Sequence, residues 1–233
     1  VLSSTIIQNP FEKFSKSNFD FDFEEKRIAQ YTNINFKDNH KENLFKIFHS
    51  KTRNMIRKAE KLGIEVEVNN EELEFLYKLH KDDMLGKNGI IKPKIFFDSL
   101  KENFIINQHW KLYTARLDGN VIAAVLLFYF NKTVEYFTPV IKEKYRDSQA
   151  LSKIIFEAMT DASLSGFTRW NWGGTWLSQE GVHRFKKRWG TEECLYNYLI
   201  KINKDHLINY DQNYITKNYP YIYVLPFNKF IKK

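Results

Sequence analysis

The sequence predicts a mixed α/β protein in which helices flank a central, mixed sheet. Three strand-like segments, 111–117, 121–130 and 133–141, follow one another with only short loops between them. Loops of this length join antiparallel strands. A helical segment then leads to a further strand over 167–172, and a helical crossover places two strands parallel. The sheet is therefore expected to contain both antiparallel and parallel neighbours.

Helices are predicted before these strands, because apolar residues recur there at three- and four-residue spacing. The pattern predicts one helix from residue 38 to residue 62, with Gly63 as its stop, and another over 71–85. An alternating segment, 64–68, predicts a strand between them, and Pro93 marks the first turn of a further helix.

The two ends of the chain differ from this central part. Residues 1–36 combine a strand-like start with an acidic, Phe-rich stretch, and we expect them to be the tail of a preceding lobe or an N-terminal extension. Residues 37–233 are expected to form the main domain, which ends with a short helix over 179–189 and strands over 195–202 and 221–225.

Composition limits the class of protein. The 233 residues are 43% hydrophobic and 27% charged, which is typical of a globular domain with a real core. No uncharged apolar run reaches the roughly 18 residues of a membrane-spanning helix. A single cysteine, Cys194, excludes an intrachain disulfide, and no signal-peptide pattern is present. We therefore expect a cytoplasmic protein.

A net charge of +8 permits an anionic partner such as a phosphate-bearing cofactor, a nucleic acid or a membrane face. The strongest local imbalance lies in 50–61, which holds five basic residues and one acidic residue. Arg53 and Arg57 lie one turn apart on one helix face, so we expect them to bind an anionic substrate or donor. The alternative is an ordinary solvated helix face.

A cleft is predicted beside Pro139, because proline has no N–H to donate and strand pairing must weaken from there onward. The next helix begins shortly after Arg146, and its first amides form an anion site. Arg146, Ser148, Gln149 and Pro139 are therefore candidates for contact with a phosphate-bearing donor, with surface charge as the alternative for Arg146.

The candidates for proton transfer are few. They are Glu135, Tyr136, Asp161, His183 and Lys186. Alternation places Glu135 and Tyr136 on opposite strand faces, and both faces are partly apolar, so the choice between them stays open. No His or Cys pair has metal-ligand spacing, and no GxSxG, Walker or GxGxxG pattern occurs, so no metal, serine-hydrolase, P-loop or dinucleotide site is expected.

The segment WNWGGTW at 170–176 holds the densest set of aromatic residues. Alternation places Asn171 on the face opposite Trp170 and Trp172, where it reaches a cleft or solvent. The Gly-Gly pair permits unusual backbone dihedrals or close approach of a ligand.

Two segments resemble a known family. SKTRNMIRKAEKLG at 50–63 is similar to the S-K-T-R-x-x-I-R-K-A-x-K-x-G segment of FemAB-like proteins, and NWGGTW at 171–176 with GVHRFK at 181–186 is similar to GNAT-like members found with surface-polysaccharide enzymes. FemAB-like proteins are double-GNAT proteins that add amino acids to peptidoglycan precursors, and relatives acylate amino sugars. The resemblance covers roughly residues 25 to 202 and implies a GNAT acyltransferase fold.

The resemblance implies an N-acyltransferase that moves an acyl group from acetyl-CoA or another acyl-CoA, or an aminoacyl group from tRNA, to an amine of a cell-envelope or surface-polysaccharide precursor. Its site would use Glu135 or Tyr136 as base, with Asn171 and Lys186 beside it. Trp172, Trp176 and His183 would contact the substrate. The alternative is a non-catalytic GNAT-like module that binds tRNA or an anionic glycan.

The sequence departs from the family at two points. A full double-GNAT protein is longer than this chain, so most of a first lobe is expected to be missing from it. The glycine-rich pyrophosphate loop of standard GNAT proteins is replaced by residues 146–149.

Overall fold

The computed structural model describes residues 1–12, 15–87, 89–219, 225 and 227. They fall into two compact units. The larger comprises residues 30–173 and 180–192, and the smaller comprises the described parts of 1–29, 174–179 and 193–233. The domain boundary expected after residue 36 remains a prediction. Most of the strand expected over 221–225 lies outside the described residues.

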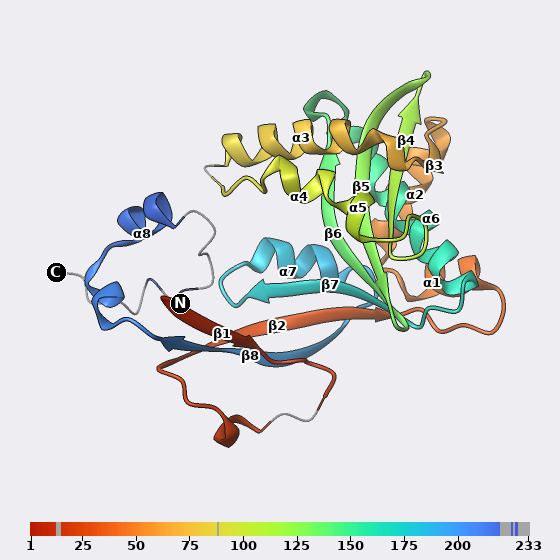
Figure 1. Ribbon diagram of the computed structural model, residues 1–233. Helices are drawn as coiled ribbons and strands as arrows, with labels where there is room; N and C mark the ends of the chain where they lie inside the picture. Colours follow the sequence, from red (N-terminus) through yellow and green to blue (C-terminus); the bar gives the residue numbers. More distant parts are fainter. Residues whose placement is uncertain (13–14, 88, 220–224, 226, 228–233) are drawn as a thin grey trace. The chain divides into compact units, whose positions relative to one another are not determined.

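The architecture is a mixed sheet flanked by helices, so the predicted fold class is confirmed (Figure 1). The described strands are β1 (Ser3–Ile7), β2 (Phe23–Asn33), β3 (Glu65–Val68), β4 (Trp110–Leu117), β5 (Asn120–Phe130), β6 (Thr133–Ile141), β7 (Arg169–Trp176) and β8 (Glu192–Ile202). They hydrogen-bond in the order β1-β8-β2-β7-β6-β5-β4-β3, and β2, β7 and β8 each contribute residues to both units.

The helices in the described ranges lie between these strands. They are α1 (His40–Ile47), α2 (Ser50–Lys61), α3 (Leu73–Gly86), α4 (Lys94–Asp98), α5 (Leu100–Asn103), α6 (Ala150–Leu164), α7 (Glu180–Lys187) and α8 (Gln212–Asn218), with the short 3-10 turns η1 (Lys16–Asn18), η2 (Asn70–Glu72), η3 (Glu143–Ser148) and η4 (Asp205–Asn209).

Strands β4, β5 and β6 form the predicted antiparallel meander, and β6 runs parallel to β7 as the helical crossover predicts. The β6–β7 ladder is short: it begins at Thr133 and ends at Glu135, which is opposite Asn171. The strands therefore part after Glu135, and the expectation that they part at Pro139 was wrong.

The cause of the early parting lies on the other side of β6. Tyr136 pairs with Leu127 and Thr138 with Leu126, so Phe137 is an extra residue in the ladder with β5. Such a bulge bends its strand and increases the local twist. Pro139 comes later, where it pairs with β5.

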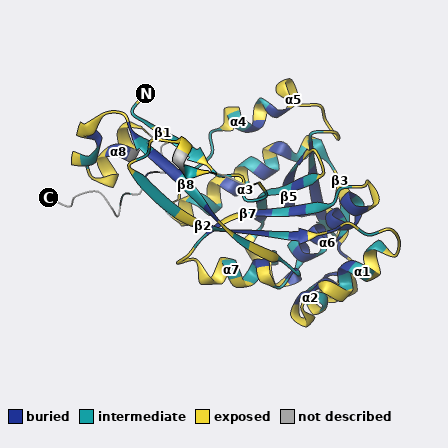
Figure 2. Ribbon diagram, turned by 90° about the horizontal axis from the view of Figure 1, so that it is seen from below, coloured by how far each residue is buried: buried dark blue, intermediate teal, exposed yellow. Residues whose placement is uncertain are grey.

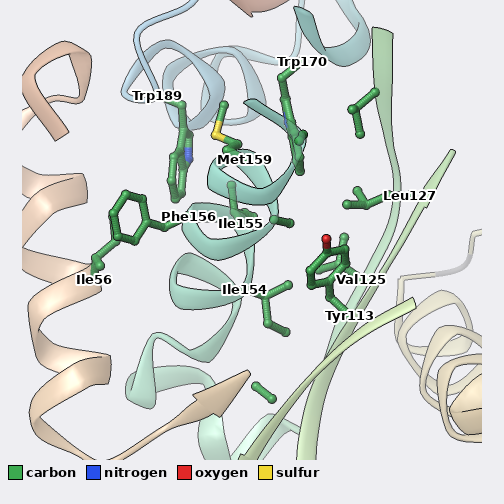
Figure 3. Packing of buried hydrophobic residues seen from close by; sticks show 14 of the residues in the cluster. Ile56, Tyr113, Val125, Leu127, Ile154, Ile155, Phe156, Met159, Trp170 and Trp189 are labelled. Atoms are coloured by element: carbon green, nitrogen blue, oxygen red, sulfur yellow. The ribbon is translucent and has the colours of Figure 1, made fainter. Parts of the chain in front are cut away.

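Two hydrophobic clusters cover the two faces of the sheet in the larger unit. Residues of α1, α2 and α6 form the first cluster with Val134 and Trp170, and residues of α3, α4 and α5 form the second with Phe137 and Val140. In the first, Ile154 of α6 points toward Tyr113 of β4, Met159 lies between Trp189 and Trp170, and Phe156 points toward α2 (Figure 3). The outer sides of α1 and α2 are exposed (Figure 2).

The helix predicted over 38–62 is two helices, because the chain is extended at Phe48 and His49. The Phe48 ring packs edge-on against Trp189, and the His49 N–H donates to the Arg188 carbonyl. The His49 ring then accepts from the Lys51 N–H and starts α2. Contacts with Trp189 and Arg188, far along the chain, therefore keep α1 and α2 separate. Local periodicity does not reveal such contacts.

The helix predicted from Pro93 is also divided, at Ser99, into α4 and α5. Pro93 itself is extended and precedes the first helical residue. In the smaller unit, β1 and β8 pair antiparallel from Ser3 opposite Ile202 to Ile7 opposite Tyr198, above a small apolar cluster.

A substitution at Gly190 should test the packing beside the α1–α2 break. Gly190 has φ of +71°, and a Cβ there would lie 2.8 Å from the Ile47 carbonyl oxygen. Gly119 has φ of +76° with nothing near its Cβ position. We expect Gly119→Ala to lower the free energy of unfolding by about 1 kcal/mol through backbone strain alone. Gly190→Ala adds a clash and should cost roughly 2–4 kcal/mol. Urea unfolding measures both, and equal losses would contradict the role of Ile47.

Candidate active site

The end of the β6–β7 ladder brings two polar side chains together. Glu135 and Asn171 are directly paired, and the Asn171 Nδ2 donates to Glu135 Oε2 at 2.5 Å. The Asn171 Oδ1 accepts from the Gly173 N–H at 3.1 Å, which fixes the orientation of the amide. Both side chains are half-buried. Asn171 therefore lies opposite the buried Trp170 and Trp172, as alternation predicts.

Lys186 of α7 reaches the same place from a different element. Its side chain is buried, and its ammonium donates to the Gly173 carbonyl at 3.2 Å. Gly173 has φ of +71°, and a Cβ there would lie 3.5 Å from Glu135 Oε1. The structure thus groups the predicted residues Glu135, Asn171 and Lys186 around one glycine.

Burial brings the pKa values of Glu135 and Lys186 closer together. It raises the pKa of Glu135 to about 7, although the Asn171 amide and the Lys186 charge oppose the shift. It lowers the pKa of Lys186 to about 8, although the Glu135 charge opposes that shift. A carboxylate that exchanges its proton near neutral pH is suited to general acid–base chemistry.

Tyr136 and Trp172 lie on the opposite face, where they form part of the apolar support for the site. Their ring centroids are 5.0 Å apart, and burial raises the pKa of Tyr136. Trp172 is 3% exposed, and its Nε1–H donates to Thr32 Oγ1. The contacts of both side chains are packing contacts, and their expected roles as base and substrate contact remain predictions.

The expected donor residues surround the turn that precedes α6. The Arg146 guanidinium is exposed and lies 3.5 Å from an Asp83 carboxylate oxygen. Ser148 Oγ accepts from the Ala150 N–H at 3.3 Å, so it is Ser148 that bonds the helix start. Gln149 is in the left-handed region, and its carbonyl accepts from the N–H groups of Ser152 and Lys153.

A cavity of about 460 Å³ lies beside this turn. Its charged lining residues are Asp82, Asp83, Lys87, Lys142, Glu143 and Arg146. Three acidic side chains balance three basic ones, and several of the first amides of α6 are already hydrogen-bonded. This arrangement is poorly matched to a pyrophosphate.

Arg53 and Arg57 make their contacts at the α1–α2 corner. The Arg53 guanidinium donates to the carbonyls of Phe45 and Phe48, which are at the end of α1. Arg57 is exposed, donates to Asn54 and lies 5.3 Å from the centre of the Phe45 ring. Arg53 thus stabilises the break between α1 and α2, and Arg57 is the one of the two that is more accessible to an anionic ligand.

The last two expected contacts lie in different units. The His183 carbonyl accepts from Gln30 Nε2 at 3.1 Å within the larger unit. The Trp176 ring stacks with the Arg27 guanidinium within the smaller one. Their expected roles in substrate binding remain predictions.

Sequence reasoning missed a polar pair on the Glu135 side of the sheet. His80 of α3 is buried, and its Nε2 accepts from the Lys92 N–H at 3.1 Å. The Lys92 ammonium lies 4.9 Å from the centre of the Phe137 ring. His80 follows Leu76 by four residues on the apolar side of α3, and that spacing could have revealed a buried histidine.

The described structure thus places a half-buried carboxylate, with a pKa near neutral, at the last pair before β6 and β7 part. Residues 48–187 match the family described as the acetyltransferase (GNAT) domain. This match spans more than half of the chain, and the protein belongs to that family. It is an acyltransferase.

Solved structures share this fold. FemX matches with a TM-score of 0.63 at 17% identity, over 88% of this chain and 67% of FemX. L-PGS from Bacillus licheniformis matches with a TM-score of 0.52 at 14% identity, over 79% of this chain and 63% of that one. The C-terminal domain of a candidate lysylphosphatidylglycerol synthetase from Agrobacterium fabrum matches with a TM-score of 0.53 at 13% identity, over 77% and 61%.

These identities establish a common fold, and the chain spans less than two thirds of the second and third of these proteins. No curated protein matches the sequence. In the ranges that the structure describes, every helix is too short or too polar to cross a membrane.

The buried His80 should make stability depend on pH. Burial lowers its pKa from 6.5 to about 4, helped by the Lys92 charge and opposed by Asp83. Between these pH values the unfolded chain binds more protons, so the free energy of unfolding should fall as the pH drops from about 6.5 to about 4. His80→Gln keeps an acceptor without this titration and should flatten the dependence. Urea unfolding from pH 4 to pH 7 tests this, with His206→Gln as an exposed control. An unchanged slope in His80→Gln would contradict it.

Proposed function

We propose that this protein is an N-acyltransferase whose acceptor is an amine of a cell-envelope or surface-polysaccharide precursor. The observation that carries the proposal is the group of Glu135, Asn171 and Lys186 at the parting of β6 and β7. FemX and L-PGS, which share the fold, support the choice of a cell-envelope acceptor.

In the proposed reaction Glu135 takes a proton from the acceptor ammonium. The freed amine attacks the acyl carbonyl, a C–N bond forms, and the bond to the donor's sulfur or oxygen breaks. The nitrogen loses its second proton as the amide forms, the departing thiolate or alkoxide takes up that proton, and Glu135 returns the first proton to solvent. Asn171 holds the carboxylate in place, and the Lys186 charge lies where it can stabilise developing negative charge. Each of these roles depends on a half-buried or buried site in which charges act strongly.

Membership of the GNAT family implies an acyl-CoA donor. The turn before α6 departs from that expectation, because it contains no glycine and its cavity carries balanced charges. A second donor, aminoacyl-tRNA, is favoured by the basic outer side of α2. Its exposed cations are Lys51, Arg57, Lys58 and Lys61.

The proposed base gives a direct test. Glu135→Gln keeps the shape and the hydrogen bond to Asn171 but removes the proton acceptor, so we expect turnover to fall by about 10²- to 10⁴-fold. Tyr136→Phe should change it far less, because Tyr136 is on the other face. The rate of acyl transfer to an amino sugar measures the turnover of both variants. Loss of turnover in Tyr136→Phe alone would move the base to Tyr136.

The pH profile provides the control for a folding defect. Turnover of the wild type should rise through about pH 7 as Glu135 loses its proton and fall above about pH 8 as Lys186 loses its charge. Arginine stays charged, so Lys186→Arg should lose the alkaline fall even if its turnover is lower. An alkaline fall unchanged in Lys186→Arg would exclude Lys186 as its source.

The donor is tested by salt dependence. With aminoacyl-tRNA as donor, binding should weaken steeply as salt rises, and Arg57→Ala should reduce that slope by about one charge. Lys81→Ala, an exposed cation on α3, is the matched control. Filter binding of tRNA and thermal shift with acetyl-CoA compare the two donors. Stabilisation by acetyl-CoA, with no change in salt slope in Arg57→Ala, would exclude the tRNA donor.

A further inference from the structure

Lys92 is held at both ends in the segment between α3 and α4. Its backbone N–H donates to the buried His80 Nε2 at 3.1 Å, and its ammonium lies 4.9 Å from the centre of the Phe137 ring. The side chain is half-buried. The two contacts restrain both the backbone and the side chain, and they limit where the charge lies before any ligand binds.

In the part of the chain that the structure describes, this charge has no acidic partner. Within the described residues, no carboxylate lies at ion-pair distance from the Lys92 ammonium, and burial lowers the pKa of Lys92. By contrast Lys94, two residues later, pairs with Asp98 and Glu74. A partly desolvated cation without a counter-charge is costly, and a ring face offsets only part of the cost.

The Lys92 charge lies on the Glu135 face of β6. Glu135 is opposite Phe128, and directly opposed residues share a face. Phe128 and Phe137 both pack in the cluster of α3, α4 and α5. Glu135 and Phe137 are two residues apart, which is roughly 7 Å along a strand.

A second polar group on this face also lacks a partner. Thr138 is 3% exposed and opposite Leu126, which belongs to the same cluster. Its hydroxyl has no hydrogen-bond partner within the described part of the chain. A fixed cation and an unsatisfied hydroxyl therefore accompany the proposed base on one side of the sheet.

We propose that Lys92 binds an anionic group, a phosphate or a carboxylate, of the amine acceptor. The proposal rests on the proposed function and narrows the acceptor to amines that carry a negative charge near the reacting nitrogen. We assign the anionic group to the acceptor and not to the donor. The expected donor turn leads into α6, and α6 packs on the face of the sheet opposite to Lys92.

Matched acceptors test this binding role. Glucosamine 1-phosphate and glucosamine differ in the phosphate, and 2-amino-2-deoxyglucuronate supplies a carboxylate instead. The wild type should prefer an anionic amine, with a lower KM. Lys92→Gln should shrink that preference by about tenfold or more, the size expected for one lost charged hydrogen bond, and Lys92→Arg should keep most of it. Lys94→Gln removes the same charge two residues away and should leave the preference intact.

A second readout needs no turnover. Reductive methylation followed by mass spectrometry reports the accessibility of each lysine amine, and glucosamine 1-phosphate should protect Lys92 but not Lys94. Thermal unfolding checks that Lys92→Gln folds. Protection of Lys92 without acyl transfer from either donor would support anion binding at Lys92 but overturn the proposed function, and with it the assignment of the anion to an acceptor. Acyl transfer with no anionic preference and no protection would overturn the inference and leave the proposed function standing.

Discussion

The site depends on where β6 leaves β7. The ladder between them ends at Glu135 and Asn171, and the extra residue Phe137 in the ladder with β5 bends β6 just beyond that point. If the strands stayed paired to Pro139, the carboxylate would lie in mid-sheet among covered residues. Because they part, Glu135 and Asn171 are the last paired residues, and their side chains hold each other by a hydrogen bond.

Aromatic packing on the other face influences the pKa values of Glu135 and Lys186. Trp172 contacts Trp189, Phe185 and Tyr136, so β7 and α7 are held together on their apolar side. That packing brings Lys186 to Gly173 and excludes water from its ammonium. Desolvation then moves the pKa of Lys186 down and that of Glu135 up. The same contacts that stabilise the fold therefore determine which group can take a proton near neutral pH.

Most of the framework could be predicted from the sequence, because short loops and one amphipathic helix specify the meander and the parallel strand. Alternation and the family resemblance pointed to Asn171 and Lys186 but left the choice between Glu135 and Tyr136 open, because both faces of that strand are partly apolar. The point of parting could not be predicted, because Phe137 reads as one more apolar residue in an alternating strand. The break at Phe48 and the Lys92 segment depend on partners far away in the sequence, which local patterns do not contain.

The two faces of the sheet carry different parts of the proposed site. Glu135 lies on the face covered by α3, α4 and α5, together with Lys92, so the proposed proton acceptor and the proposed charge contact for the acceptor amine lie on one side. The turn that precedes α6 carries balanced charges and selects no phosphate by charge alone. In the proposed reaction, proton transfer at Glu135 needs only an activated carbonyl within reach of the amine, whichever carrier delivers it. On that proposal the same catalytic group can serve different donors, whose contacts would lie on the surface of α2 and at the turn before α6.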